Sequence, residues 1–125
     1  MDVKTAASFF SGNVNDDDWV PFEYPQDGET QSYGEVVPFR DLGSAGQLLA
    51  VGLWRCNTLG ASPVYSSELG DETFLVLEGE VHITVEETGE LFIYRQGDVG
   101  SWSRGTRTTW DVKSPFKKFY VVAAA

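Results

Sequence analysis

The sequence predicts a single all-β domain, and three features of its 125 residues support this. Apolar and polar residues alternate from Glu80 to Val85, which is the period-two pattern of a half-buried strand. Glycine-containing turn signals follow one another at residues 78–79, 87–90 and 97–98. Helical periodicity is weak throughout, and this length is typical of one domain. We therefore expect a meander of short antiparallel strands.

Residues 1–34 are expected to form an N-terminal arm, with one possible helical turn over residues 4–10. An acidic run at residues 16–18 is interpreted as a solvated loop, because it lacks the ligand spacing and turn glycine of a calcium loop. The aromatic segment 19–24 is interrupted by Pro21, which suits an extended arm or an edge strand. In a small barrel such an arm often covers a partner subunit or plugs one end.

The barrel domain is expected over residues 35–125, and its first strands are predicted at residues 35–40 and 47–56. The second strand is apolar enough to be covered on both faces. Within it, alternation places Trp54 and Cys56 on one face and Arg55 on the other. We interpret Cys56 as a small buried apolar side chain rather than a nucleophile.

Later segments place several polar and aromatic side chains on common faces. In each segment the residues that share a face are two apart, as the geometry of a strand requires. The shared faces carry Glu72, Phe74 and Val76; then Thr108 and Trp110; and finally Lys118, Tyr120 and Val122 in a closing strand over residues 116–122.

The order of the motifs resembles the cupin superfamily. Glu72 and Gly79, followed by Gly97-Asp98 and Arg104-Gly105, are similar to the two cupin motifs. Four further elements resemble the ureidoglycine-aminohydrolase-type cupins: Trp-x-Cys at residues 54–56, VLEGE at 76–80, Gly-x4-Trp at 105–110 and Lys-x-Tyr at 118–120. The likeness covers residues 35–122. It implies a double-stranded β-helix, a cupin jelly-roll barrel of about ten strands, and a homodimer formed through the N-terminal strands.

The metal-binding histidines of the usual cupin pattern are missing. The positions of the His-x-His pair hold Ser66 and Glu68, or Tyr65 and Ser67, depending on loop length, and the late histidine is Thr108.

A site of the usual cupin kind combines imidazoles with a carboxylate. The single histidine, His82, is expected on the polar side of its strand. We therefore expect no metal site and no cofactor. An oxygen-rich site that uses Glu72, Glu68 or His82 is the alternative.

In cupins the face that bears the motif glutamate lines the barrel interior, so the resemblance makes Glu72 the candidate catalytic residue. Burial among aromatic rings disfavours the charged form of a carboxyl, which then becomes a usable acid or base near neutrality, whereas a nearby Lys118 would do the reverse. A purely structural ion pair with Lys118 or Arg107 is the alternative, as is core packing for Trp102 and Trp110. The candidate ligand-binding residues are Tyr65, Phe74, Thr108, Trp110 and Lys118.

Composition restricts the partners. Nine Lys and Arg residues against 19 Asp and Glu give a formal net charge of −10, which argues against nucleic-acid binding. No apolar run approaches the roughly 20 residues of a membrane span, and the first residues lack the pattern of a secretion signal. Cys56 is the only cysteine, so no intrachain disulfide can form. We expect a cytoplasmic protein.

Three hypotheses for function remain. The first is a metal-free cupin that binds a small polar metabolite in its barrel. The second is a metal-independent isomerase, lyase or cyclase that uses Glu72 as acid or base, assisted by Tyr65 or Lys118. The third is a structural or regulatory subunit that uses the aromatic arm at residues 19–24. Fold alone cannot choose among them.

Overall fold

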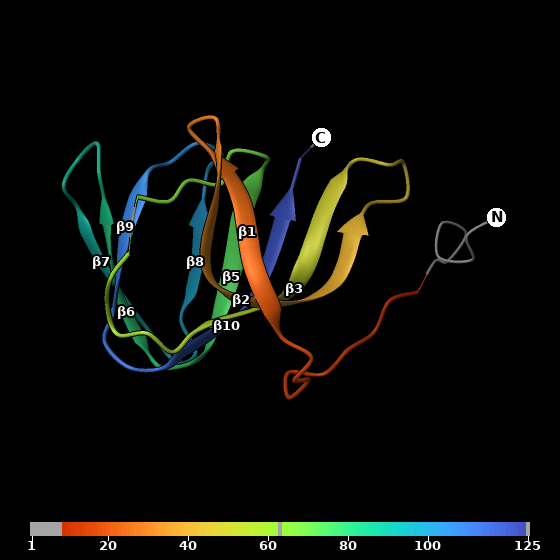
Figure 1. Ribbon diagram of the computed structural model, residues 1–125, viewed down its shortest axis with the longest axis horizontal. Coiled ribbons are helices and arrows are strands. Elements are labelled where there is room, and N and C mark those ends of the chain that lie inside the picture. The colour runs from red at the N-terminus through yellow and green to blue at the C-terminus, as the bar shows by residue number, and fades with distance from the viewer. Residues whose placement is uncertain (1–8, 63, 125) are drawn as a thin grey trace.

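The computed structural model describes residues 9–62 and 64–124, which form ten strands in two antiparallel sheets (Figure 1). The six-stranded sheet has the order β1-β2-β3-β10-β5-β8, and the four-stranded sheet has the order β4-β9-β6-β7. The expected all-β barrel is confirmed. The strands are β1 Val20–Gln26, β2 Glu29–Leu42, β3 Leu48–Cys56, β4 Gly60–Ala61, β5 Asp71–Glu78, β6 Glu80–Val85, β7 Leu91–Arg95, β8 Val99–Trp102, β9 Thr108–Val112 and β10 Phe116–Ala123.

The described residues contain no helix, and so none that could cross a bilayer. The helical turn expected over residues 4–10 lies outside the described residues up to position 8, and residues 9–10 are not helical.

Alternation correctly identified the buried face of β5. Glu72, Phe74 and Val76 are buried, and the residues between them are more exposed. The bend after this strand needs Gly79, because its φ is +87° and a Cβ there would lie 2.2 Å from the carbonyl oxygen of Pro115. The chain therefore turns at residue 79 into β6, as the sequence suggested.

The N-terminal part contributes more to the barrel than expected. β1 is an edge strand that pairs with β2, and β2 starts at Glu29 rather than at residue 35. A two-residue turn joins them, with φ of 53° at Asp27 and 79° at Gly28, which matches the left-handed geometry of a tight hairpin. The expected boundary between residues 34 and 35 thus falls inside β2.

The segment before β1 crosses the outer face of the six-stranded sheet. The guanidinium of Arg55 lies 4.3 Å from the centroid of the Trp19 ring, and Lys117 Nζ donates a hydrogen bond of 2.8 Å to the carbonyl oxygen of Val14. Val37 and Leu53, on this outer face, are also buried. Residues 14–19 therefore lie against the chain's own sheet.

The core lies between the two sheets and is rich in aromatic rings. The rings of Trp54 and Trp110 meet edge to face with centroids 5.6 Å apart, and Phe116 packs against both. Gly100 leaves room for the ring of Phe74, since a Cβ at this glycine would lie 2.5 Å from that ring. This packed core supports one side of a cavity.

Candidate functional site

A cavity of about 340 Å³ opens on the inner side of the six-stranded sheet. It is bounded by β1, by strands β2, β3, β10 and β5, and by the loop at residues 65–69. Its volume is sufficient for a small organic ligand. Seven aromatic residues contribute to its wall: Phe22, Tyr24, Tyr33, Trp54, Tyr65, Trp110 and Tyr120.

A buried ion pair lies in the wall of this cavity. Lys118 Nζ is 2.5 Å from Glu72 Oε2, and the two residues are only 5% and 3% exposed. The hydroxyl of Tyr65 donates a hydrogen bond of 3.0 Å to Glu72 Oε1. Both oxygens of the buried carboxylate therefore have a donor, as a buried charge requires.

Sheet register shows how the pair forms. Glu72 is opposite Val122 and Lys118 is opposite Val76, so the two charged residues are not cross-strand partners. The lysine side chain reaches along the sheet, where its ammonium lies 4.8 Å from the centroid of the Phe74 ring. The ammonium is also 4.4 Å from the Trp110 ring and 5.1 Å from the Trp54 ring. The lysine is therefore held by one carboxylate and three aromatic rings.

Burial and carboxylates set the electrostatics of the cavity. Desolvation lowers the pKa of Lys118 below its ordinary value, and Glu72 opposes this effect. Burial, and then the charge of Glu72, raises the pKa of the Tyr65 hydroxyl well above its ordinary value. The pKa of Tyr120 is raised by burial and then by the carboxylates of Asp41 and Glu72. Two tyrosines of the wall therefore experience a negative field.

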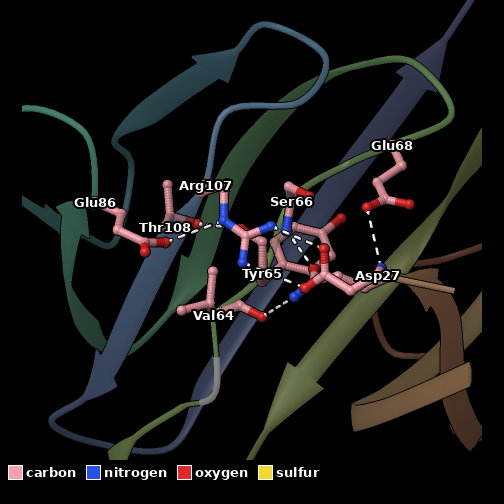
Figure 2. Close-up of polar contacts among 9 residues, drawn as sticks. Asp27, Val64, Tyr65, Ser66, Glu68, Glu86, Arg107 and Thr108 are labelled. Atoms are coloured by element: carbon pink, nitrogen blue, oxygen red, sulfur yellow. Dashed lines mark hydrogen bonds and ion pairs between the residues drawn. The ribbon is translucent and has the colours of Figure 1, made fainter. Parts of the chain in front are cut away.

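The loop that carries Tyr65 is anchored by the β1–β2 hairpin (Figure 2). Gln26 Oε1 accepts a 2.8 Å hydrogen bond from the N–H of Ser66, and Gln26 Nε2 donates to the carbonyl oxygen of Val64. Because Gln26 is buried, these bonds replace the water contacts that the loop would otherwise make. The hairpin therefore fixes the position of Tyr65.

A surface ion-pair network adds a second contact to the same hairpin (Figure 2). Two nitrogens of Arg107 lie 3.2 and 3.3 Å from the carboxylate of Asp27, and its Nε lies 3.2 Å from Glu86. The network joins the β1–β2 turn to the residue that precedes β9. Arg107 thus pairs with Asp27 and Glu86, and not with Glu72, which was one alternative from the sequence.

The predicted site residues divide into two groups. Glu72, Trp110 and Lys118 line the cavity on the strand faces that alternation gave them, and Tyr65 lines it from the loop at residues 65–69. Phe74 does not line it. Its ring is 1% exposed and packs 5.2 Å from the ring of Tyr94, so it belongs to the core beneath the ion pair.

Thr108 also lies in the core and not on the cavity wall. Its hydroxyl accepts a 2.9 Å hydrogen bond from Trp110 Nε1 and donates one of 3.1 Å to the carbonyl oxygen of Tyr65. The donor and one acceptor lone pair of the hydroxyl are therefore used within the protein. Thr108 positions two wall residues.

The donors around Glu72 do not fit a metal ion of the usual cupin kind. Its two oxygens face an ammonium and a phenol, and His82 lies on another strand face, where its Nε2 is 2.7 Å from Glu80. Glu68 accepts the N–H of Asp27 at 3.4 Å. Residues 9–62 and 64–124 contain no group of three or more metal-ligating side chains. The positive charge beside the motif glutamate is the lysine ammonium.

Several cavity residues were missing from the predicted site. Tyr120 lies on the same strand face as Lys118, so strand alternation could have added it to the predicted site. The same holds for Trp54, which alternation had assigned to one face of its strand. Tyr24 was assigned to an arm, although Phe22 and Tyr24 are two residues apart and face the cavity together. Asp41 gave no signal, because register shifts in β2 interrupt the alternation before it.

Known protein structures resemble this fold. The chain is similar to the cupin domain of Schizosaccharomyces pombe Cnp3, with a TM-score of 0.61 and 16% identity, covering 87% of this chain and 86% of that chain. It is also similar to the ethanolamine utilization protein EutQ of Salmonella typhimurium, with a TM-score of 0.60 and 18% identity, covering 84% and 94% of the two chains. At these identities the likeness concerns the fold alone.

A protein of the DUF861 family from Thermotoga maritima is 27% identical, with a TM-score of 0.51, and the match covers 56% of this chain and 75% of that chain. No curated protein sequence matches.

The sequence itself matches a family profile. The profile describes the EutQ-like cupin domain and matches residues 44–120, which is more than half of the chain. The matched region runs from the turn before β3 into β10 and contains Glu72, Trp110 and Lys118. The chain therefore belongs to the EutQ-like cupin domain family of the cupin superfamily.

Proposed function

We propose that this cupin binds a small molecule in its barrel cavity without a tightly held metal. The observation that supports the proposal is a cavity that combines an aromatic wall with the buried Glu72–Lys118 pair. A buried ion pair contributes little net stability compared with apolar residues of similar size, so a role in ligand binding would explain it. The aromatic wall offers apolar area to a ligand and the ion pair offers polar contacts.

The contacts of the aromatic arm at residues 19–24 favour small-molecule binding over the role of a structural subunit. Trp19 contacts Arg55, whereas Phe22 and Tyr24 line the cavity. These side chains are thus engaged with the chain's own barrel.

A cavity-filling substitution tests the proposal. Ala50 lines the cavity on the inner face of β3, opposite Val122. We expect Ala50→Phe to abolish the thermal shifts that hits from a small-metabolite library cause in the parent protein. Ala61→Phe is the matched control, because Ala61 is exposed on β4 in the other sheet. Equal ligand binding by both folded variants would place the ligand elsewhere and refute the proposal.

A second candidate function is metal-independent acid–base catalysis, supported by the hydrogen-bonded chain Tyr65–Glu72–Lys118. A carboxylate that faces both a phenol and an ammonium could exchange a proton with a bound substrate, as in an isomerase, lyase or cyclase. Once a substrate is known, Glu72→Gln should abolish turnover while ligand binding persists. Retained turnover in a folded Glu72→Gln protein would exclude this role.

We also propose a cytoplasmic homodimer that pairs through the N-terminal strands. Among residues 9–62 and 64–124, no strand pairs with the outer edge of β1, and Val20 on this strand is 48% exposed. An exposed strand edge is a template for pairing with a second chain. Light scattering after size exclusion should give twice the mass of the 125-residue chain, and a monomeric mass at micromolar concentration would contradict the dimer.

A further inference from the structure

We infer that the cavity selects organic cations, namely molecules with an ammonium or quaternary ammonium group attached to an apolar body. This inference rests on the proposed binding function and specifies the class of ligand. It is based on the charges around the cavity, on its aromatic wall and on one buried hydroxyl without a partner.

The charged residues around the cavity are predominantly acidic. Asp41, Glu68 and Glu72 line it, together with Glu23 of β1, whereas Lys118 is the only basic residue among the described lining residues. The charge of Lys118 is balanced by Glu72 at 2.5 Å. An anionic ligand would therefore face carboxylates without a free cation to receive it, and an incoming cation would be attracted.

The aromatic wall already holds one ammonium. Lys118 Nζ lies 4.4 Å from the centroid of the Trp110 ring and 5.1 Å from that of Trp54. Both rings also contribute to the cavity surface. The electron-rich faces of these rings attract cations, most strongly where water is excluded. Ring faces elsewhere in the same wall would attract an organic cation in the same way.

Elimination assigns the cationic group to the end of the cavity near Asp41. Glu72 is occupied by Lys118 and Tyr65, and Glu68 accepts the N–H of Asp27. Glu23 lies between Phe22 and Tyr24 in β1, and because these two face the cavity, strand alternation directs the Glu23 side chain to the other face. Asp41 influences the hydroxyl of Tyr120, whose pKa is raised by burial and then by Asp41 and Glu72. A ligand ammonium could pair with Asp41 there while its apolar body contacts the aromatic wall.

A separate observation also points to a ligand. The hydroxyl of Tyr24 is buried and has no hydrogen-bond partner among the described residues, although the residue lines the cavity and is only 6% exposed. A buried hydroxyl without a partner is costly, and native structures seldom keep one without a reason. The oxygen itself has almost no exposed surface, so a polar group of the ligand would satisfy this hydroxyl after a small movement of the wall.

Three ligands of similar shape test the inference: benzylammonium, benzyl alcohol and benzoate, titrated by calorimetry at pH 7 and constant ionic strength. One exposed carboxylate and one or two aromatic faces should make the cation bind roughly three- to tenfold more tightly than the alcohol. Benzoate should bind most weakly.

Variants then connect the preference to the residue. Asp41→Asn should reduce the affinity for benzylammonium to that for benzyl alcohol, with the alcohol unaffected. Glu87→Gln makes the same change in net charge in the β6–β7 turn and should leave the preference intact.

The outcomes distinguish the two proposals. If the alcohol or benzoate binds as tightly as the cation and Ala50→Phe abolishes that binding, the cation inference is overturned and the binding function stands. If Asp41→Asn leaves the cation preference unchanged, the assignment to Asp41 is overturned. If none of the three ligands binds at millimolar concentration, the cation inference is overturned, and the library screen with Ala50→Phe decides the binding function separately.

Discussion

The ammonium of Lys118 lies 2.5 Å from the carboxylate of Glu72 in a position where both residues are at least 95% buried. The two residues are held by different strands, β10 and β5, and by the rings between them. A pair in such surroundings loses hydration on both charges, so each charge depends on the other.

Removing one partner of the pair should destabilise the fold more than removing both. Lys118→Met leaves a buried carboxylate without its cation, and we expect the free energy of unfolding to fall by roughly 3–5 kcal/mol. The double variant Glu72→Leu/Lys118→Met should recover most of this loss, because no charge then remains buried. Urea titrations of the variants measure the difference.

Lys113→Met is the control for Lys118→Met. It breaks the Lys113–Asp111 pair, whose side chains are over 40% exposed, and should cost less than about 1 kcal/mol. If the two single lysine variants are equally stable, the buried pair has no special dependence.

The hydroxyl of Tyr65 should contribute to the stability of the fold, whereas that of Tyr24 should not. Tyr65→Phe removes the hydrogen bond to Glu72 Oε1, and a bond to a charged group is worth roughly 1.5–3 kcal/mol. Tyr24→Phe removes a buried hydroxyl that has no partner in the described structure, so stability should be unchanged or slightly higher. Thermal and urea unfolding of the two variants measure this contrast, and a larger loss for Tyr24→Phe would contradict it.

Much of the barrel could be predicted because its later strands follow simple alternation. Within β5, and again within β6, the side chains alternate between buried and more exposed positions, and the sequence placed the face of Glu72 correctly. The N-terminal part was harder, because Pro21 and Pro25 interrupt β1, and register shifts at Pro38 and Arg40 interrupt β2. A bulge changes which residues of a strand share a face, so alternation did not identify Asp41 and Tyr24 as residues of the cavity wall.

Contacts between residues of the site were less predictable than their strand faces. Strand alternation placed Lys118 and Tyr120 on one face. It could not show that the Lys118 side chain reaches Glu72, which is not its cross-strand partner. Thr108 lies on the same strand face as Trp110, as predicted, but its hydroxyl bonds to Tyr65 and Trp110, and such hydrogen bonds cannot be deduced from the spacing of residues. The alternation of apolar and polar residues predicts which side chains share a strand face. Which side chains contact one another is seen only in the structure.

The turn at Gly79 should tolerate no side chain. Gly79→Ala forces a φ of +87° on a residue with a Cβ and places that Cβ 2.2 Å from the carbonyl oxygen of Pro115. Gly89 has a similar φ of +74° but nothing within 4 Å of the added Cβ, so Gly89→Ala should cost only about 1 kcal/mol. Gly79→Ala should therefore lower the thermal midpoint much further than Gly89→Ala. Equal midpoints would show that the backbone at residue 79 can move.

Stability should fall as the pH rises above 10, because burial raises the pKa of five tyrosines above the model-peptide value of 10.0: Tyr24, Tyr33, Tyr65, Tyr94 and Tyr120. The folded state keeps these protons while the unfolded chain loses them, so stability present below pH 10 is lost above it, by up to about 1.4 kcal/mol per pH unit for each tyrosine. Lys118 acts in the opposite direction, because its pKa is lowered, but it is one group against five. Urea titrations from pH 8 to 11 measure the slope, and Tyr120→Phe should make it shallower by about one proton's contribution. A slope that is flat above pH 10, or unchanged in Tyr120→Phe, would show that these hydroxyls titrate as freely in the folded protein as in the unfolded chain.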